Sequence, residues 1–211
     1  MSFYTGTQCE LLYAMPASGA AVTAAAATVM SGTTAANPAY AMPLDFFWQK
    51  SGGGAGRSML LKGGGWWSTA TAARTTNFQV GLNSTAGTGT IALPFGKTGT
   101  LTTVVTTNAL WGFEVLVTCT SPGFGSTASA LNAFGWVEYG IGNNAATGTF
   151  GTYSSNNASR FMIGTGQTPI APVPSTQYYI ECSNTWDATT NSPTMRQPGG
   201  SRGPAFQVRG F

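Results

Sequence analysis

Alternating apolar and polar residues, the pattern of a half-buried β-strand, are clearest between Trp111 and Cys119. Segments 178–186 and 77–82 show the same period of two. Successive side chains of a strand point to opposite faces, so we expect one face of each segment to lie in the core. The expected core side chains are Trp111, Phe113, Val115, Val117 and Cys119; Tyr178, Ile180, Cys182 and Trp186; and Phe78, Val80 and Leu82.

Further short segments are rich in β-forming residues and are bounded by Gly, Pro, Asn or Ser. Long helical periodicity is absent from the sequence. Strands joined by such loops predict an all-β fold, and we expect a single antiparallel β-sandwich of jelly-roll type over residues 46–211, with a barrel as the alternative. The additional expected strands are 58–62, 88–93, 100–107, 131–139 and 205–210.

Residues 1–45 show a different pattern. The run from Ala20 to Met30 is small, apolar and uncharged. Alanine favours a helix, but the interspersed Val and Thr weaken that preference and no charged face would solvate the helix. We therefore expect residues 1–45 to form an extended N-terminal arm that lies on a neighbouring subunit and is mobile in the free one. A short helix is the alternative.

The composition favours a protein that is covered by partners. Charged residues make up 7% of the 211 residues and hydrophobic ones 42%, whereas about 25% charged residues are usual in soluble domains. The net charge of +3 comes from scattered single residues, which does not favour nucleic acid as a direct partner. No stretch reaches the roughly 20 apolar residues of a membrane span. The first residues also lack a secretory signal pattern, so we expect neither export nor a membrane partner.

Histidine is absent from the chain. This removes the commonest general base, the usual catalytic triads and the commonest metal ligand. The three cysteines, Cys9, Cys119 and Cys182, are too widely spaced for a zinc site and fit no disulfide framework, so buried or free thiols are expected. We therefore expect no enzyme, no cofactor, and no catalytic, cofactor-binding or metal site.

Paired carboxylates could still carry out acid–base chemistry. Glu114, Glu138 and Glu181 fall in expected strands, opposite the hydrophobic stripe, and would converge if those strands were neighbours. Separate solvated or Arg-paired side chains are the favoured interpretation. The full set of candidates is Glu10, Asp45, Glu114, Glu138, Glu181 and Asp187.

Tryptophans could line a carbohydrate groove, but those within strand patterns are expected in the core. Trp66 and Trp67 are adjacent and must point to opposite strand faces, so one of them is expected outside the core, at an interface. The Gly-rich stretch 51–56 lacks the Gly-Lys-Ser/Thr ending of a phosphate-binding loop and is expected to be a flexible turn. The six tryptophans are Trp48, Trp66, Trp67, Trp111, Trp136 and Trp186.

Four sequence landmarks occur in order between residues 40 and 197: PLDFF at 43–47, GRSMLLKGGG at 56–65, WGFEVLVTCT at 111–120 and YYIECSNTW at 178–186. This succession resembles a group of tailed-bacteriophage structural proteins. There, a P-x-x-F-F segment precedes a Gly-rich turn and a G-(K/R)-S-L-L strand, and a W-x-(L/F)-E strand and an aromatic-polar strand follow. The Gly/Pro-rich segment 196–204 departs from the group's usual closing strand.

The resemblance implies a virion protein without catalysis, folded in the cytoplasm of a bacterial host. The leading hypothesis is a capsid decoration or cementing protein, expected as a homotrimer, that packs on the major capsid protein across capsomer junctions. The alternative is a tail, baseplate or fibre component, including one that binds glycans through exposed aromatic side chains. A secreted carbohydrate-active enzyme is a third class and would need a signal sequence and a convergent acid pair.

Overall fold

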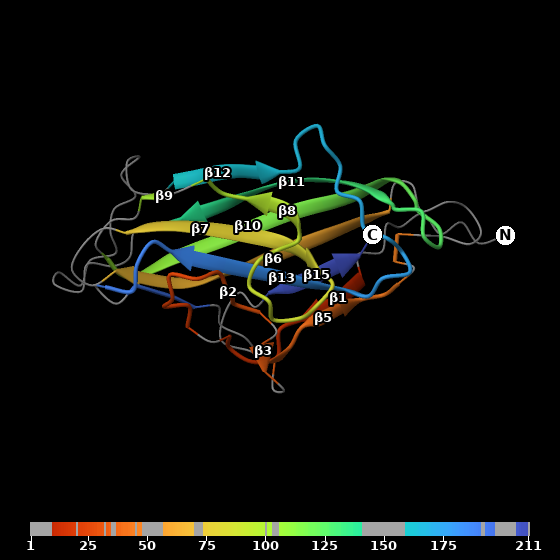
Figure 1. The fold of residues 1–211 in the computed structure, drawn as a ribbon. Coiled ribbons are helices and arrows are strands. Elements are labelled where there is room, and N and C mark those ends of the chain that lie inside the picture. Colours follow the sequence, from red (N-terminus) through yellow and green to blue (C-terminus); the bar gives the residue numbers. More distant parts are fainter. Residues whose placement is uncertain are drawn as a thin grey trace.

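The chain is described from a computed structural model in which two antiparallel β-sheets pack against each other (Figure 1). The described residues contain no helix. The expected all-β class and sandwich architecture are therefore confirmed. The structure describes residues 10–211 except 20, 32, 35–36, 45, 48–56, 70–73, 100, 103–105, 141–158, 191–192, 197–205 and 211.

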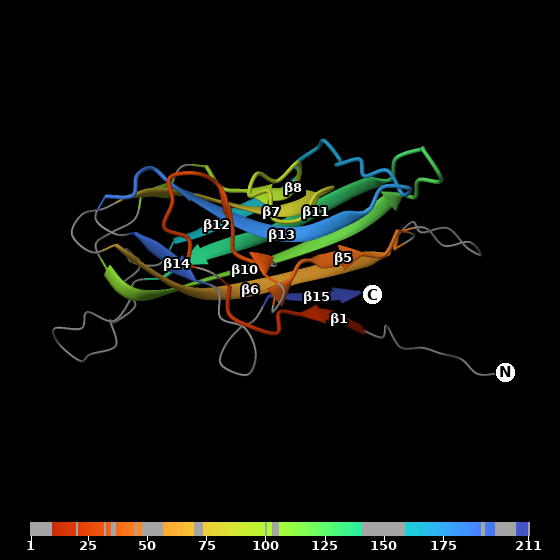
Figure 2. The ribbon, with the colours of Figure 1, turned by 60° about the horizontal axis from the view of Figure 1, so that its bottom comes forward.

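Among the described residues, seven strands form the larger sheet, and every pairing in it is antiparallel. Figure 2 shows the strands one above another, from β1 and β15 through β6 and β10 to β11. Their order is β1 (Glu10–Ala14), β15 (Gln207–Gly210), β6 (Ser58–Thr69), β10 (Thr106–Ser121), β11 (Ala130–Tyr139) and β12 (Ser159–Gly164), and β14 (Thr194–Arg196) also pairs with β6.

The second sheet has six strands within the described residues, again antiparallel. A separate two-stranded sheet pairs β3 (Thr33–Thr34) with β4 (Asn37–Pro38). The order in the six-stranded sheet is β2 (Thr28–Val29), β13 (Tyr178–Trp186), β7 (Thr75–Asn83) and β8 (Leu93–Lys97), with β5 (Tyr40–Met42) beside β13 and β9 (Leu101–Thr102) beside β7.

The core lies between the two sheets and is supplied by the alternating residues of β10, β13 and β7. Phe113 of β10 meets Phe78 of β7 with 5.0 Å between ring centroids, and Trp111 lies 5.7 Å from the same ring. The period-two predictions for these strands are confirmed, because all of their expected core side chains except the half-buried Tyr178 are buried. Those are Trp111, Phe113, Val115, Val117, Cys119, Phe78, Val80, Leu82, Ile180, Cys182 and Trp186.

Strands β6 and β7 follow each other in the chain but lie in different sheets. Two late strands return to them: β15 pairs with β6, and β13 pairs with β7. Residues from both halves of the sequence therefore close the same core.

The structure does not confirm an N-terminal arm that extends away from the sandwich. The described part of residues 1–45 packs on its own domain: β1 pairs with β15, β5 with β13, and Val22 bridges to Met195. Met15, Val22 and Met30 are fully buried in the core. A few large apolar side chains among the small ones are sufficient to anchor this segment. Residues 1–9 lie outside the described residues.

Segment 88–93 is a loop up to Leu93, where β8 begins, so the strand expected there is wrong. Gly87 and Gly89 both have φ of 78°, a backbone conformation that interrupts a strand and that glycine adopts readily. Thr and Ile favour a strand in this segment, but the glycines between them adopt a turn conformation, so no strand forms before Leu93. The Gly-rich stretch 51–56 lies outside the described residues.

Candidate functional site

The outer surface of the seven-stranded sheet carries a set of exposed apolar side chains, and we call this surface the open face. They come from the outward positions of four neighbouring strands, β6, β10, β11 and β12. The inward positions of the same strands fill the core. The exposed side chains, with their exposed fractions, are Trp66 (38%), Leu110 (59%), Leu116 (43%), Phe134 (67%) and Met162 (60%).

Strand register brings these side chains together in two groups. Leu110 pairs with Trp66 across β10 and β6. Leu116 pairs with Phe134 across β10 and β11. Met162 lies on the next strand, β12, where it pairs with Trp136, two residues along β11 from Phe134. Leu110 and Leu116 are six residues apart on β10, which corresponds to about 20 Å. The apolar groups therefore extend along the sheet.

Two ion pairs lie between the apolar groups. Lys62 Nζ is 2.7 Å from Glu114 Oε2, across β6 and β10. Arg160 Nη2 is 3.0 Å from Glu138 Oε2, across β12 and β11, and the Arg160 guanidinium lies 4.4 Å from the ring centroid of Trp136. Each of these four charges has its counter-ion on the neighbouring strand, so together they add no net charge to the open face.

An open groove of about 490 Å³ runs beside Phe134. Leu116, Phe134 and Met162 line it, together with Gly164, which is paired with Phe134 in the register of β11 and β12. Because Gly164 has no side chain, the strand neighbouring Phe134 leaves one flank of the ring uncovered. The open face thus combines a projecting aromatic ring with an adjacent depression.

The outer surface of the six-stranded sheet, which we call the covered face, is covered in part by the chain itself: Glu181 and Asn83 are buried there, whereas Gln79 is half-buried. Loop 84–92 crosses in front of β13 (Figure 1). Its residue Ile91 packs on Gly81, where a Cβ added to the glycine would come within 2.6 Å of Ile91 Cγ2. A Cβ on Gly89 would come within 2.1 Å of the Ala27 carbonyl oxygen, so the loop also rests on the N-terminal segment.

Glu181 is fully buried on the covered face. Its Oε2 accepts a hydrogen bond from Asn83 Nδ2 at 2.7 Å, and its Oε1 accepts one from the Gly87 backbone N–H at 2.5 Å. Asn83 Oδ1 accepts a further bond from the Ala92 N–H at 2.7 Å. Burial raises the pKa of the Glu181 carboxyl, and the bonds from Gly87 and Asn83 oppose that shift. The carboxyl therefore fastens loop 84–92 to the sheet.

The structure separates the three acids that the sequence placed in strands. Glu114 and Glu138 do share the open face, but each is bound to a cation, whereas Glu181 belongs to the other sheet. Asp187 lies 3.9 Å from Arg74. Glu10 begins β1, and Asp45 lies outside the described residues. The favoured interpretation of separate solvated or Arg-paired side chains fits Glu138, which is paired with an arginine, whereas Glu114 is paired with Lys62. The hydrogen-bonded burial of Glu181 had no sequence signal.

Trp66 and Trp67 divide as their adjacency predicts: Trp66 is on the open face and Trp67 is buried. Trp111 and Trp186 are also core residues, and Trp186 Nε1 donates a hydrogen bond to the Val22 carbonyl at 3.0 Å. Trp136 is partly covered by Arg160, and Trp48 lies outside the described residues. The sequence did not identify Phe134 and Met162 as exposed. The exposure of these two side chains follows from the pairing of β11 with β12, which places both on the outer side of the sheet.

Cys119 and Cys182 are buried, as expected, and neither forms a disulfide among the described residues. Cys182 Sγ lies 3.6 Å from Ser31 Oγ, and burial raises the pKa of Cys119. Cys9 lies outside the described residues. Within the described ranges, no group of three or more Cys, Asp or Glu side chains is placed to hold a metal ion. The described part of the chain also contains no helix of the length and apolarity that a bilayer crossing requires.

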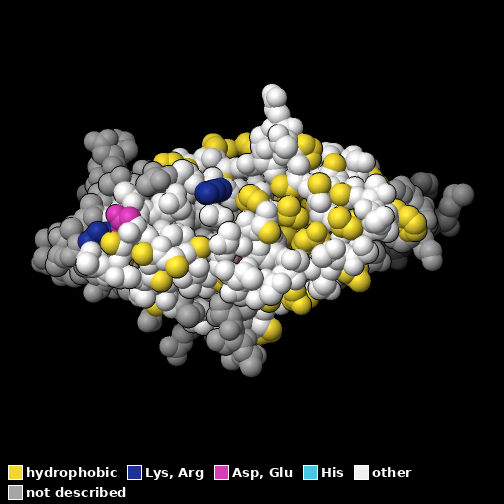
Figure 3. Space-filling view, viewed as in Figure 1, with side chains coloured by type: hydrophobic (Ala, Val, Ile, Leu, Met, Phe, Trp, Pro, Cys, Tyr) yellow, Lys and Arg dark blue, Asp and Glu magenta, His cyan; other side chains and the backbone are white. Residues whose placement is uncertain are grey.

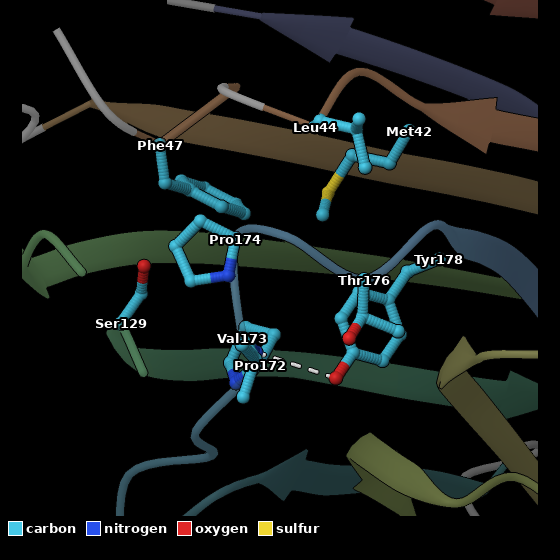
Figure 4. A pocket seen from close by; sticks show the side chains of 9 residues that line it. All are labelled: Met42, Leu44, Phe47, Ser129, Pro172, Val173, Pro174, Thr176 and Tyr178. Carbon is cyan, nitrogen blue, oxygen red and sulfur yellow. Dashed lines mark hydrogen bonds between the residues drawn. The ribbon is translucent and has the colours of Figure 1, made fainter. Parts of the chain in front are cut away.

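A small apolar pocket lies where the β5 region meets loop 172–178 (Figure 4). In Figure 4 the Phe47 ring faces Pro174, and the Val173 N–H donates a hydrogen bond of 3.3 Å to the Tyr178 hydroxyl. The space is about 10 Å³, roughly enough for one water molecule. It is therefore a packing gap rather than a ligand site.

Figure 3 views the molecule from the side of the covered face, where few charged side chains are seen and hydrophobic ones gather over the right half. The candidate functional site is the open face on the opposite side, because that sheet surface is left uncovered by the described chain. Comparison of the chain with protein-family models, with curated proteins and with solved structures finds no match.

Proposed function

We propose that this protein is a structural subunit of a bacteriophage virion that works by packing against other protein surfaces. The observation that carries the proposal is the open face, where four neighbouring strands present large apolar side chains to solvent. Large exposed apolar patches are rare on soluble monomers and mark sites of contact with other proteins. Charged residues make up only 7% of the chain. Its surface therefore has few charges whose mutual repulsion would keep copies apart.

Within the virion, the proposed position is the capsid. A decoration protein adds buried area across capsomer junctions, where many weak contacts sum over many copies. The proposed partners are the major capsid protein and further copies of this chain, with a homotrimer as the proposed assembly. The subunit would fold in the host cytoplasm before it joins the particle.

The strand pairing is compatible with the jelly-roll topology that we propose. In the described chain, β6 and β7 are each met by a strand from the late part of the sequence, β15 and β13 respectively. Such return of late strands to early ones is a feature of Greek-key connections, from which jelly rolls are built. Residues 1–9, outside the described part, are the remaining candidates for an arm that reaches a neighbour.

A non-catalytic role is part of the proposal, and it is supported by the state of the acidic side chains. Glu114 and Glu138 are bound to Lys62 and Arg160. Glu181 uses both oxygens to hold a loop. These groups therefore have structural partners that account for their positions.

A tail or fibre component that binds glycans is the alternative. Trp66 and Phe134 would supply its stacking surfaces. Trp136 offers less, since the Arg160 guanidinium lies against its ring at 4.4 Å. The aliphatic surroundings of Phe134 and its lack of adjacent free carboxylates among the described residues fit a protein contact better than a sugar site.

The test is to locate the chain on particles of the phage that encodes it. Particles would be labelled with an antibody fragment raised against the purified protein and imaged by cryo-electron microscopy. Label spread over the head is the expected result. Label confined to the tail or fibres would replace the decoration role with the alternative. Unlabelled particles that still contain all their structural proteins by mass spectrometry, this chain excepted, would refute both.

A further inference from the structure

The open face has a shape that is complementary to itself. Phe134 projects from β11 with 67% of its surface exposed. The groove of about 490 Å³ lies directly beside it, between Phe134, Met162 and the bare backbone of Gly164. A projection and a recess that adjoin on one surface match the same pair on a second molecule turned by a twofold rotation. Each ring can then enter the other molecule's groove.

We propose that a second copy of this chain docks face to face on the open face, with Phe134 of each copy seated in the groove of the other. The inference deepens the proposed function and rests on its premise that the open face is a protein contact. It departs from the proposed homotrimer at one point, because a twofold contact at the open face joins two copies rather than three. It names the occupant of that face and the residue at the centre of the contact. It does not depend on which particle, or which part of one, carries the protein.

The area of the open face fits such a dimer. If a large apolar side chain is taken as about 200 Å², the exposed fractions of the five residues correspond to about 500 Å² of apolar surface. A stable interface buries about 800 Å² on each partner, with an apolar centre and a polar rim. Thr118 and Asn132, the next outward pair beyond Leu116 and Phe134, supply part of such a rim. Lys62 and Glu114 lie between the two apolar groups and would be enclosed by the contact as an ion pair.

The charges on the open face also favour a second copy. Lys62–Glu114 and Arg160–Glu138 are ion pairs within one molecule. Each charge therefore brings its own counter-ion into the contact, and two identical faces can meet without net repulsion between these groups. A strongly charged partner, such as a nucleic acid, would find no matching excess of charge there.

The edge position of β12 leaves room for this contact. β12 ends the seven-stranded sheet and pairs with β11 alone among the described strands. Met162 and Gly164 therefore have no further strand beside them within the described chain, and the groove opens sideways as well as outward. A ring that approaches from a second copy meets no described element in its way.

The chain offers a closely matched control for Phe134. Phe124 is 66% exposed, against 67% for Phe134, but it lies in the loop between β10 and β11 and outside the open face. Phe134→Ser and Phe124→Ser thus remove the same ring at the same exposure. Only the first removes it from the proposed contact.

The experiment measures the oligomeric state of the purified full chain and of both variants by sedimentation equilibrium over a range of concentrations. Far-ultraviolet circular dichroism and thermal unfolding verify that each variant is folded. We expect the unaltered chain and Phe124→Ser to associate equally, and the dissociation constant of Phe134→Ser to rise at least tenfold. Met162→Ser, which alters the groove wall, should weaken association in the same direction.

A chain that is monomeric at every concentration would overturn the proposal, and so would association that Phe134→Ser leaves unchanged. A monomeric chain whose binding to particles depends on Phe134 would mean that a different protein covers the face, which also overturns it. Association through Phe134 without any label on particles would uphold this inference while refuting the virion function. The two proposals can therefore fail separately.

Discussion

The two sheets of this sandwich differ in what lies on their outer surfaces. On the covered face, loop 84–92 crosses β13 and is held by Glu181, and the N-terminal segment borders the same sheet. On the open face, Leu116, Phe134 and Met162 are exposed. The same weakly charged chain thus covers much of one outer surface with its own residues and leaves large apolar side chains exposed on the other. Exposed apolar residues here reflect position rather than composition.

The largest effect on this comparison is expected from removing the chain that borders the covered face. Deletion of residues 1–40 takes away β1 to β4, the first residue of β5 and the buried side chains of Met15, Val22 and Met30. Truncation of one such side chain alone costs about 2–5 kcal/mol, so the total approaches a typical domain stability of about 5–15 kcal/mol. We expect the truncated chain to be unfolded by circular dichroism. A cooperative unfolding transition near that of the full chain would show that the segment is dispensable.

Two adjacent residues of β10 separate the core from the open face. Val115 is fully buried and Leu116 is 43% exposed. Val115→Asp places a carboxylate in the core at a cost of several kcal/mol. This cost is comparable to the free energy of unfolding of a typical domain, so we expect no folded protein. Leu116→Asp should keep a thermal midpoint within a few degrees of the unaltered chain. Equal effects of the two variants in thermal unfolding would contradict the assignment of the faces.

Glu181 and Glu138 compare a buried carboxylate with one on the open face. Glu181→Ala leaves the Gly87 N–H and Asn83 Nδ2 without their acceptor. The loss should cost about 1–3 kcal/mol for the buried Asn83 amide and less for the exposed Gly87, whose N–H can bind water. Glu138→Ala breaks an exposed ion pair and should cost less than about 1 kcal/mol. Urea unfolding measures both. We also expect faster amide exchange in loop 84–92 for Glu181→Ala only, and protected loop amides in that variant would argue against its role as a fastener.

The smallest expected effect is a pH dependence that comes from Glu181. Burial raises its pKa above the unfolded-state value, which is about 4.3. A raised carboxyl pKa means that the folded chain holds its proton more tightly, so this group's contribution is complete below the unfolded value and declines as pH rises through the folded one. The difference in free energy of unfolding between the unaltered chain and Glu181→Gln should shrink over that window. If the free energy of unfolding of the unaltered chain instead rose with pH relative to that of Glu181→Gln, the pKa of Glu181 would be lowered by folding rather than raised.

The sequence predicts best those strands that have one buried and one solvated face. In β10 the alternation of Trp111, Phe113 and Val115 with polar residues marks the core side directly, because each position experiences a single environment. In β13 the same alternation predicts that Glu181 is solvated. It is buried, because a loop far away in sequence covers that face. The environment of a strand position can thus depend on a segment that its own pattern does not include.

The open face could be predicted only in part. The adjacency of Trp66 and Trp67 requires one of them to point outward, and this is confirmed. Phe134 gives no such signal, since an aromatic residue in a strand usually faces the core, and its exposure follows from the pairing of β11 with both β10 and β12. Strand β12 itself was not predicted, because Met162 adds an apolar residue between Phe161 and Ile163 and the short segment therefore lacks alternation. Pairing between strands is a long-range property that local periodicity does not specify.

The return of β13 and β15 to β7 and β6 has a consequence for the order of folding. During synthesis, β6 and β7 emerge well before their partners, so their inner side chains remain without Phe206 and Val208, which are both fully buried in the finished core. Closure over such long separations in sequence is slow, typically about milliseconds to seconds for β-sandwiches. The ribosome would therefore release a chain whose sandwich is still incomplete. Until it closes, the unpaired edges of β6 and β7 are exposed to other nascent copies, and the chaperones of the cell would act on the protein at this stage.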